Sequence, residues 1–345
     1  MAEYISFQPS DFFNTKLYTG TGSSNAITGV GFQPDATWIK GRNTTYNHVF
    51  TDAVRGVTEE IYSNTTGAEV TNAQGLTAFG SDGFTVGTDA GYNGNTNTYV
   101  SWNWKGGTTS GIATNGSTTI TPSAYSFNQT SGCSIIKYTG NGTAGAKLAH
   151  GLGATPDFFI IKGLDATTDW DVYHSSLGAT KWLELNADGS VSTSTNRWND
   201  TEPDSVNITL GDSTHVNDSS DFVAYCFSAK RGYSKFSSYA ANGNADGAFI
   251  YTGFRPAFIL LKDTATNAWY LMDSKRDGYN AENKGLIPSQ NSIEQAGSYG
   301  VDFLSNGFKC RTTDGWTNGS GLTYLYAAFA EFPLVSSNDI PTVAR

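Results

Sequence analysis

Three segments of the chain share one pattern, and this internal repetition constrains the fold more than any other feature. Each begins with a proline, continues with five residues that are mostly aromatic or β-branched, and ends with a lysine six positions after the proline. Proline suits the first residue of a strand because it cannot donate a ladder hydrogen bond. Five such residues without apolar–polar alternation predict a strand that is covered on both faces. The segments are residues 34–40, 156–162 and 256–262.

Further landmarks recur in the same order around each of these segments. A strand that runs into a Gly/Asn turn lies upstream, and an aromatic closing strand lies downstream. The spacing from a glycine or serine before each closing strand to its last aromatic residue is nearly constant, at 21, 22 and 22 residues. The matching order predicts three repeats, each with several short strands and frequent turn signals, as in a β-sandwich. The closing strands are expected at residues 99–104, 222–227 and 324–329.

The fold class expected is therefore all-β, with three tandem antiparallel β-sandwich repeats of jelly-roll type; the lectin-like description follows from the resemblance given below. A linker rich in Gly, Ser and Thr makes the first repeat more independent, whereas the other two are joined directly and should form a stiff pair. Residues 288–296 are the one stretch that allows a turn of helix. The segments expected are an N-terminal attachment segment at 1–12, repeats at 13–105, 134–229 and 230–332, the linker at 106–133, and a C-terminal tail at 333–345.

Composition excludes several classes of protein. A formal net charge of −10 without a Lys/Arg cluster argues against nucleic-acid binding. No apolar run reaches transmembrane length, so membrane insertion is not expected. The 8 Trp, 18 Tyr and 20 Phe argue against disorder. Cys133, Cys226 and Cys310 are too few and too scattered for a disulfide framework or a zinc site, and three reduced thiols suit folding in a bacterial cytosol.

A search for catalytic patterns finds none that is specific. No HExxH motif and no GxSxG elbow is present, and Cys226 lies in an apolar strand, where a small buried hydrophobe is the expected role. We therefore expect no enzyme, no catalytic residue, no cofactor and no metal. The four histidines are expected to be polar groups of strands or loops: His48, His150, His174 and His215.

One cluster of carboxylates is a candidate catalytic group, because a polysaccharide-cleaving enzyme needs two carboxylates at a fixed separation. Asp165, Asp169 and Asp171 lie close together in the chain, and such oxygen ligands could also suit Ca²⁺. Aspartate is common in β-turns because its side chain caps its own backbone. The turn role is the favoured interpretation, with the hydrolase and the calcium site as alternatives.

Four tryptophans are the candidate ligand or subunit contacts. Trp198 and Trp316 lie in polar, turn-rich segments, where an indole could stack on a sugar face or anchor a contact with a neighbouring subunit. Trp102 and Trp104 end the first repeat, at positions where the other repeats have different residues.

Several blocks of the sequence resemble a family of tailed-phage virion proteins. Members are common in phages of marine and other aquatic bacteria, and are usually described as structural or tail-fibre-like proteins with lectin-like β-sandwich domains. The resemblance implies a virion protein that is made in the host bacterial cytoplasm, and it assigns no catalytic residues. The first repeat departs from the pattern, since it lacks the Ser-Lys-Phe element of the third. The blocks that carry the resemblance are residues 4–22, 232–262, 305–309, 324–333 and 341–345.

The function expected from these observations is a non-enzymatic bacteriophage virion structural protein on the tail, fibre or capsid surface, active in particle assembly or host-surface attachment. One alternative is a capsid decoration or cement protein that stabilises the head lattice. Another is a glycan-binding receptor protein or a polysaccharide depolymerase. The expected partners are other virion proteins, further copies of the chain, with a trimer favoured because few lysines guard the sheet edges, and a host-surface glycan.

Overall fold

The computed structural model describes residue 5 and residues 7–330, 334–335 and 341–342. Strands dominate this part of the chain, which holds only two α-helices of four residues each and a 3-10 turn at Pro9–Asp11. The predicted all-β class is confirmed. Most of the expected C-terminal tail, and residues 1–4 and 6 of the expected attachment segment, lie outside the described residues. No helix in the described ranges has the length and apolarity that crossing a membrane requires.

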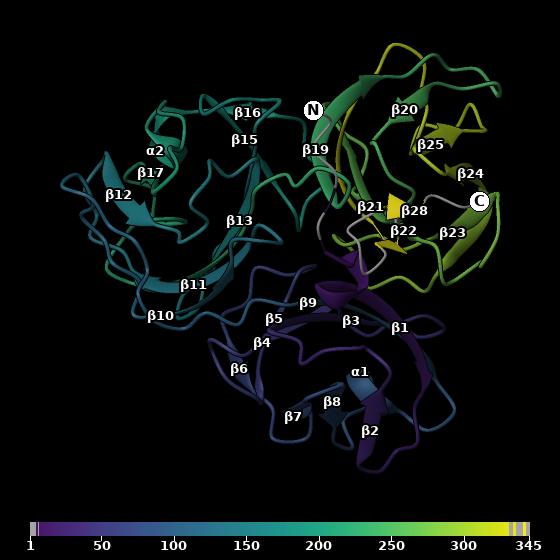
Figure 1. The fold of residues 1–345 in the computed structure, drawn as a ribbon, viewed down its shortest axis with the longest axis horizontal. Helices are drawn as coiled ribbons and strands as arrows, with labels where there is room; N and C mark the ends of the chain where they lie inside the picture. The colour runs from purple at the N-terminus through teal and green to yellow at the C-terminus, as the bar shows by residue number, and fades with distance from the viewer. Residues whose placement is uncertain (1–4, 6, 331–333, 336–340, 343–345) are drawn as a thin grey trace.

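Figure 1 shows three lobes that meet around a common centre. Lobe 1 holds β1(Phe13–Thr19), β2(Asn25–Thr28), β3(Ala36–Gly41), β4(Val49–Asp52), β5(Glu59–Tyr62), β6(Val70–Thr71), β7(Leu76–Gly80), β8(Gly83–Val86), α1(Ala90–Asn93) and β9(Thr98–Trp104). Lobe 2 holds β10(Ala124–Asn128), β11(Cys133–Thr139), β12(Ala146–Ala149), β13(Phe158–Gly163), β14(Trp170–His174), β15(Lys181–Glu184), β16(Ser192–Thr193), α2(Thr195–Trp198), β17(Asn207–Leu210) and β18(Asp221–Phe227). Lobe 3 holds β19(Ser234–Ala240), β20(Phe249–Tyr251), β21(Pro256–Asp263), β22(Tyr270–Asp273), β23(Glu282–Gly285), β24(Gln295–Leu304), β25(Gly307–Cys310) and β26(Thr323–Ala330). A small pair follows, β27(Leu334–Val335) with β28(Pro341–Thr342).

The same order of strand pairing recurs in all three lobes. The first long strand pairs with the closing strand, which pairs with the proline-to-lysine strand, which pairs with the strand that follows it. The order is β1-β9-β3-β4 in lobe 1, β11-β18-β13-β14 in lobe 2 and β19-β26-β21-β22 in lobe 3. Each of these sheets packs against a second sheet of its own lobe: β2-β8-β7, β12-β17 or β20-β25-β24-β23. The three closing strands and the three repeated strands overlap the predicted segments. Only β21 begins at its proline as predicted, whereas β3 and β13 begin two residues after theirs.

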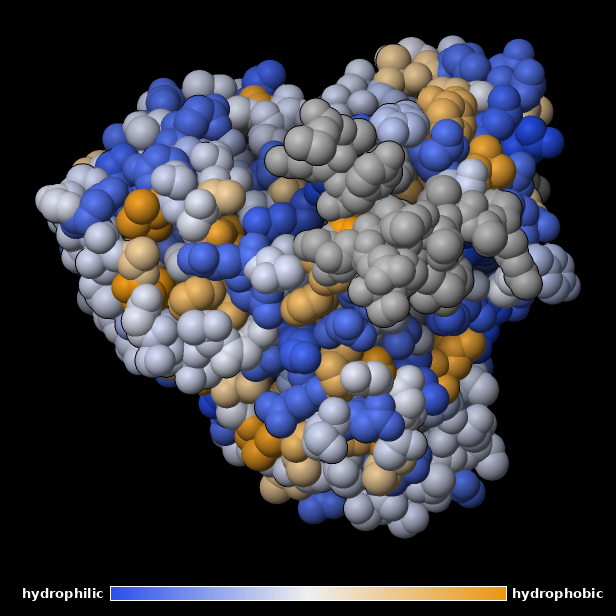
Figure 2. Space-filling model, viewed as in Figure 1, coloured by the Kyte–Doolittle hydropathy of each residue, from blue (hydrophilic) through white to orange (hydrophobic). Residues whose placement is uncertain are grey.

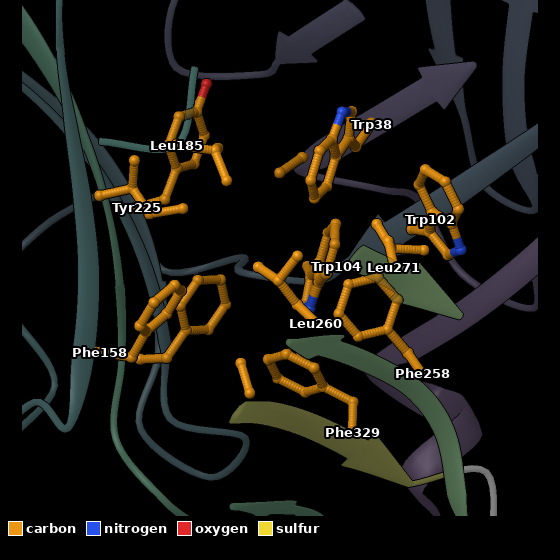
Figure 3. Close-up of a cluster of buried hydrophobic side chains, with 14 of the residues drawn as sticks. Trp38, Trp102, Trp104, Phe158, Leu185, Tyr225, Phe258, Leu260, Leu271 and Phe329 are labelled. Carbon is orange, nitrogen blue, oxygen red and sulfur yellow. The ribbon is translucent and has the colours of Figure 1, made fainter. Parts of the chain in front are cut away.

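The proline-to-lysine strands are buried on both faces, as predicted, because each lies between two cores. Ile161 of β13 packs in the core of lobe 2, while its neighbour Ile160 faces the centre of the molecule. Side chains point to alternate faces of a strand, so one five-residue stretch serves both cores. All three lobes send residues to the shared cluster, which we call the central core. Its labelled members in Figure 3 are Trp38, Trp102, Trp104, Phe158, Leu185, Tyr225, Phe258, Leu260, Leu271 and Phe329.

Lobe 1 is therefore not the more independent unit that its linker suggested, and that prediction is wrong. Trp104 of lobe 1 contacts the rings of Phe227 in lobe 2 and Phe329 in lobe 3, with centroids 6.1 and 5.7 Å apart. Lobe 1 thus contributes to the common core like the other two lobes. A flexible linker limits only how far a domain can move. Lobe 1 stays attached to the other lobes because its apolar face is buried against theirs.

Two other segments differ from expectation. The end of the predicted linker forms β10, which adds to the edge of the main sheet of lobe 2. The predicted helical turn at residues 288–296 is instead irregular and then enters β24. The helices that do form, α1 and α2, each begin after a side chain that caps the first turn, Asp89 or Ser194.

The lysine that ends each repeated strand is a buried loop anchor. Lys40 Nζ donates to the carbonyls of Gly41 and Thr44, both at 2.8 Å. Lys162 Nζ donates to the carbonyl of Thr66, in lobe 1, at 3.0 Å. Three donors on one ammonium group satisfy loop carbonyls that would otherwise be buried without partners. Lys262, the third member, donates in the same way to the loop that follows β21.

Candidate functional site

The structure corrects three of the four tryptophan assignments. Trp102, Trp104 and Trp198 are 0, 4 and 1 % exposed, so their rings cannot touch a sugar or another subunit. Trp198 packs edge-on against Phe159 in the core of lobe 2, and its indole donates to the carbonyl of Lys181. Trp198 is buried although its neighbours in the chain are polar, because burial of its large apolar ring lowers the free energy of the folded state.

The aspartates singled out in the sequence are structural partners rather than a ligand cage. Asp171 is buried and accepts from Arg197 Nε at 2.8 Å, while Asp169 accepts from Asn186 at 2.8 Å. Asp165 accepts from the backbone N–H of Asp221, which is 56 positions away and not in its own turn. Nowhere in the described part of the chain do three or more His, Cys, Asp or Glu side chains gather as metal ligands would.

The four histidines are similarly engaged or buried. His150 contacts the carbonyl of Asp204 at 3.1 Å, and burial lowers its pKa. His48 is fully buried, and burial holds its pKa well below the ordinary value. Only His215 is partly exposed, and its hydrogen bond to Asp171 raises its pKa. The three cysteines are free and buried.

A different site emerges from a residue that the sequence analysis missed. Each lobe has one fully buried asparagine just before its closing strand, at Asn93, Asn217 or Asn318. The side chain of Asn217 donates to the carbonyls of Thr143 and Gly211 at 2.9 and 2.7 Å and accepts from the Asn141 N–H at 2.8 Å. The other two asparagines make the corresponding bonds in their own lobes. The asparagines therefore mark equivalent positions in the three lobes.

In lobe 1, the residues before Asn93 border an open cleft of about 180 Å³. Three tyrosines, two carboxylates and an amide supply most of its wall. They come from the loop before β4, from β5 and from the turn that carries α1. The lining residues are Tyr46, Asn47, Val49, Glu60, Tyr62, Asp89, Ala90, Gly91 and Tyr92.

The polar groups of this lobe-1 cleft are held in place by the protein. The hydroxyl of Tyr62 donates to Glu60, and Asn72 Nδ2 lies 3.3 and 3.2 Å from the two carboxylate oxygens of Glu60. The Tyr92 hydroxyl lies 3.0 Å from the hydroxyl of Thr51. Burial raises the pKa of both Tyr62 and Tyr92, with Glu60 adding to the shift, so both hydroxyls keep their protons at neutral pH. The cleft thus presents fixed rings and hydrogen-bonding groups.

The equivalent position is filled in the other two lobes by their own side chains. Two residues before the buried asparagine, lobe 1 has Gly91, lobe 2 has His215 and lobe 3 has Trp316. His215 Nδ1 lies 3.5 Å from Asp171 and 3.3 Å from Arg197, whose guanidinium stacks on a tryptophan of β15. In lobe 1 this position is a glycine, which has no side chain to fill the space, and the cleft is open there.

Trp316, the fourth tryptophan predicted as a contact residue, fills this position in lobe 3. Its ring centroid lies 5.6 Å from Tyr270 and 6.4 Å from Tyr299, and it is half-buried. The spacing Asp89–Asn93, Ser213–Asn217 and Asp314–Asn318 is the sequence signal that could have found the site. The equivalence became visible only when the asparagine hydrogen bonds aligned the lobes.

Comparison with known families gives one match. A family model described as a domain of unknown function (DUF7483) matches residues 8–333. No curated protein and no solved structure matches the chain. The match spans all three lobes, which indicates that the family is defined on the whole three-lobed unit.

Proposed function

Since the chain belongs to the DUF7483 family, whose function is unknown, we propose that it is a non-enzymatic structural protein of a tailed-phage particle. It stands on the tail, a fibre or the capsid surface and contributes to particle assembly or host-surface attachment. Its three lobes act as tandem β-sandwich repeats of lectin-like type. The resemblance of its sequence blocks to phage virion proteins motivates this proposal, and the central core is the structural observation that supports it.

The central core favours a mechanical role because it makes three lobes into one rigid body. Trp170 of lobe 2 donates from its indole to the carbonyl of Tyr62 in lobe 1 at 2.9 Å. Trp269 of lobe 3 donates in the same way to Glu184 of lobe 2 at 2.7 Å. Together with the shared apolar cluster, these bonds resist relative motion of the lobes, as a particle component under load requires.

The chemistry of the described side chains supports a role without catalysis. Two of the carboxylates that a hydrolase could use are engaged in internal bonds: Asp171 with Arg197, and Glu60 with Tyr62 and Asn72. If the protein released new reducing ends from host envelope polysaccharide, the non-enzymatic proposal would be overturned.

Contacts with other subunits are part of the same proposal. Strand β20 forms an edge of the outer sheet of lobe 3 and exposes Phe249 and Tyr251, at 46 and 59 %. Unpaired edges with aromatic side chains favour packing against a partner. Figure 2 shows the viewed face, outside the grey atoms, as a mixture of hydrophilic residues and small apolar groups. Other virion proteins or further copies of this chain, as in a trimer, are the proposed partners, and light scattering on the purified protein tests self-association.

The experiment that tests the proposed function is quantitative mass spectrometry of purified phage particles. We expect the protein in the particles, in a fixed ratio to the major capsid protein. A few copies per particle indicate a tail or fibre position, whereas hundreds indicate a capsid decoration protein. Presence in the infected-cell lysate but absence from purified particles would contradict a virion role.

A further inference from the structure

We propose that the lobe-1 cleft binds one pyranose ring of a neutral sugar. This inference deepens the proposed function, on which it rests, because it assigns the host-surface contact to a defined site and a ligand class. In the other two lobes a side chain, His215 or Trp316, takes the equivalent position.

The three lobes differ at one equivalent position. In lobes 2 and 3 the position is occupied by His215 and Trp316, and in lobe 1 it is Gly91. The local backbone is the same, because Asp89 and Asp314 each accept at 2.7 Å from the N–H two residues on. In lobe 3 an indole ring lies there against Tyr270. The lobe-1 cleft is therefore an empty space at the position where lobe 3 holds an indole ring. A ring from an external ligand can occupy that space.

The wall of the cleft combines aromatic rings with hydrogen-bonding groups. Sugars have an apolar face of C–H groups and a rim of hydroxyls, so they suit sites that combine aromatic rings with hydrogen-bonding groups. Tyr46, which is 42 % exposed, offers a ring at the mouth of the cleft. Asn47 and Asp89, which are both partly exposed, offer donors and acceptors around it. A cavity of about 180 Å³ is smaller than typical drug-sized sites of roughly 300–1,000 Å³, which restricts it to a single ring.

The cleft carries negative charge, and one of its carboxylates is held in place by neighbouring side chains. Glu60 and Asp89 both line the cleft, and the chain carries a formal net charge of −10. Carboxylates accept hydroxyl hydrogen bonds well but repel an acidic sugar, so the ligand class is neutral. Because Glu60 is already held by Tyr62 and Asn72, little side-chain ordering accompanies binding.

The test measures binding of methyl glycosides of glucose, galactose, mannose and N-acetylglucosamine to the full chain by saturation-transfer NMR, with glucuronic acid as the acidic comparison. We expect at least one neutral glycoside to bind and glucuronic acid not to bind. Tyr46→Ala should weaken binding about tenfold, because the stacking ring is lost. Tyr279→Ala removes a 79 % exposed tyrosine of lobe 3 and should leave binding unchanged.

A second pair of variants tests the lobe comparison directly. Gly91→Trp places in lobe 1 the ring that lobe 3 already has, and we expect it to abolish binding while the thermal unfolding midpoint is retained. His215→Trp makes the matched change in lobe 2 and should leave binding intact. Absence of binding by all four glycosides at millimolar concentration, or binding that survives both Gly91→Trp and Tyr46→Ala, would overturn the proposal. Neither result bears on whether the protein is found in particles, so the two proposals fail separately.

Discussion

The hydroxyl of Tyr225 in lobe 2 donates a hydrogen bond to Oδ2 of Asp52 in lobe 1, over 2.7 Å, inside the protein. Asp52 is also paired with Arg55 at 2.6 Å, and the side chains of both residues are 0–1 % exposed. Lobe 3 repeats the ion pair with Asp273 and Arg276, also at 2.6 Å. In each case the buried charges are tolerated because they are paired and hydrogen-bonded.

This contact is one member of a closed ring. Trp102 of lobe 1 donates to Asp273 of lobe 3 at 3.1 Å. In lobe 2 the position of these aspartates is taken by His174, whose Nε2 lies 3.2 Å from the carbonyl of Tyr326 in lobe 3. Every lobe is therefore joined to both others by a buried polar contact as well as by the central core.

The first prediction concerns the Tyr225–Asp52 bond. Tyr225→Phe removes the donor and leaves the rings packed, so the free energy of unfolding should fall by about 1–3 kcal/mol. Urea denaturation followed by tryptophan fluorescence measures the change. Tyr279→Phe, at an exposed position, is the control and should have no effect. Equal stability of the Tyr225→Phe variant and the unaltered protein would contradict an energetic role for this bond.

The second prediction is that the chain unfolds in a single cooperative transition. The lobes share the central core, so loss of one exposes apolar surface of the other two. Scanning calorimetry should show one peak whose calorimetric and van't Hoff enthalpies agree. Resolved peaks for separate lobes would show that the core does not couple them.

The third prediction concerns acid. Burial lowers the pKa of His174 to about 4, from an ordinary value of about 6.5. Between these values the unfolded chain takes up a proton that the folded protein does not, so stability falls as the pH drops from about 6.5 to 4, by up to about 3 kcal/mol. His174→Asn should lose less stability across this window than the unaltered protein, as measured by urea denaturation at each pH. His215→Asn is the contrast, because the pKa of His215 is raised and its removal should not reduce the acid loss.

The fourth prediction tests the buried asparagine. Asn217→Ala leaves two carbonyls and one N–H without their partner, and should cost more than about 2 kcal/mol of unfolding free energy. Asn95→Ala, at an exposed position of lobe 1, is the matched control and should change stability little. If the two variants are equally stable in urea, the asparagine does not anchor its loop.

The fifth prediction concerns the thiols. Cys133, Cys226 and Cys310 are at most 1 % exposed, and burial raises the pKa of each. A buried, protonated thiol is a poor nucleophile. Ellman's reagent should therefore detect no thiol in the native protein and three in denaturant. Rapid labelling of the native protein would show that one of these strands opens readily.

The sequence was informative about local structure and less so about what packs on it. The uninterrupted run that ends at Lys162 predicted a strand covered on both faces, and β13 lies between two cores. By contrast, Trp198 stands among polar turn residues that favour exposure, yet it is buried. Its burial depends on Phe159, more than thirty positions away in the chain, and no local pattern records that contact.

The candidate site divides in the same way. The sequence contains Gly91, His215 and Trp316 at matching distances from an asparagine, and so determined which lobe lacks a side chain at this position. It also determined the repeated strands, because a run of five mostly aromatic or β-branched residues is a local property. Only the tertiary structure decided that these faces meet in one central core, and that Tyr46, Glu60 and Asp89 border one cleft. An apolar face in the sequence shows that the face must be buried, but it does not show which surface buries it. The hydrophobic effect is non-directional, so any complementary surface can do so.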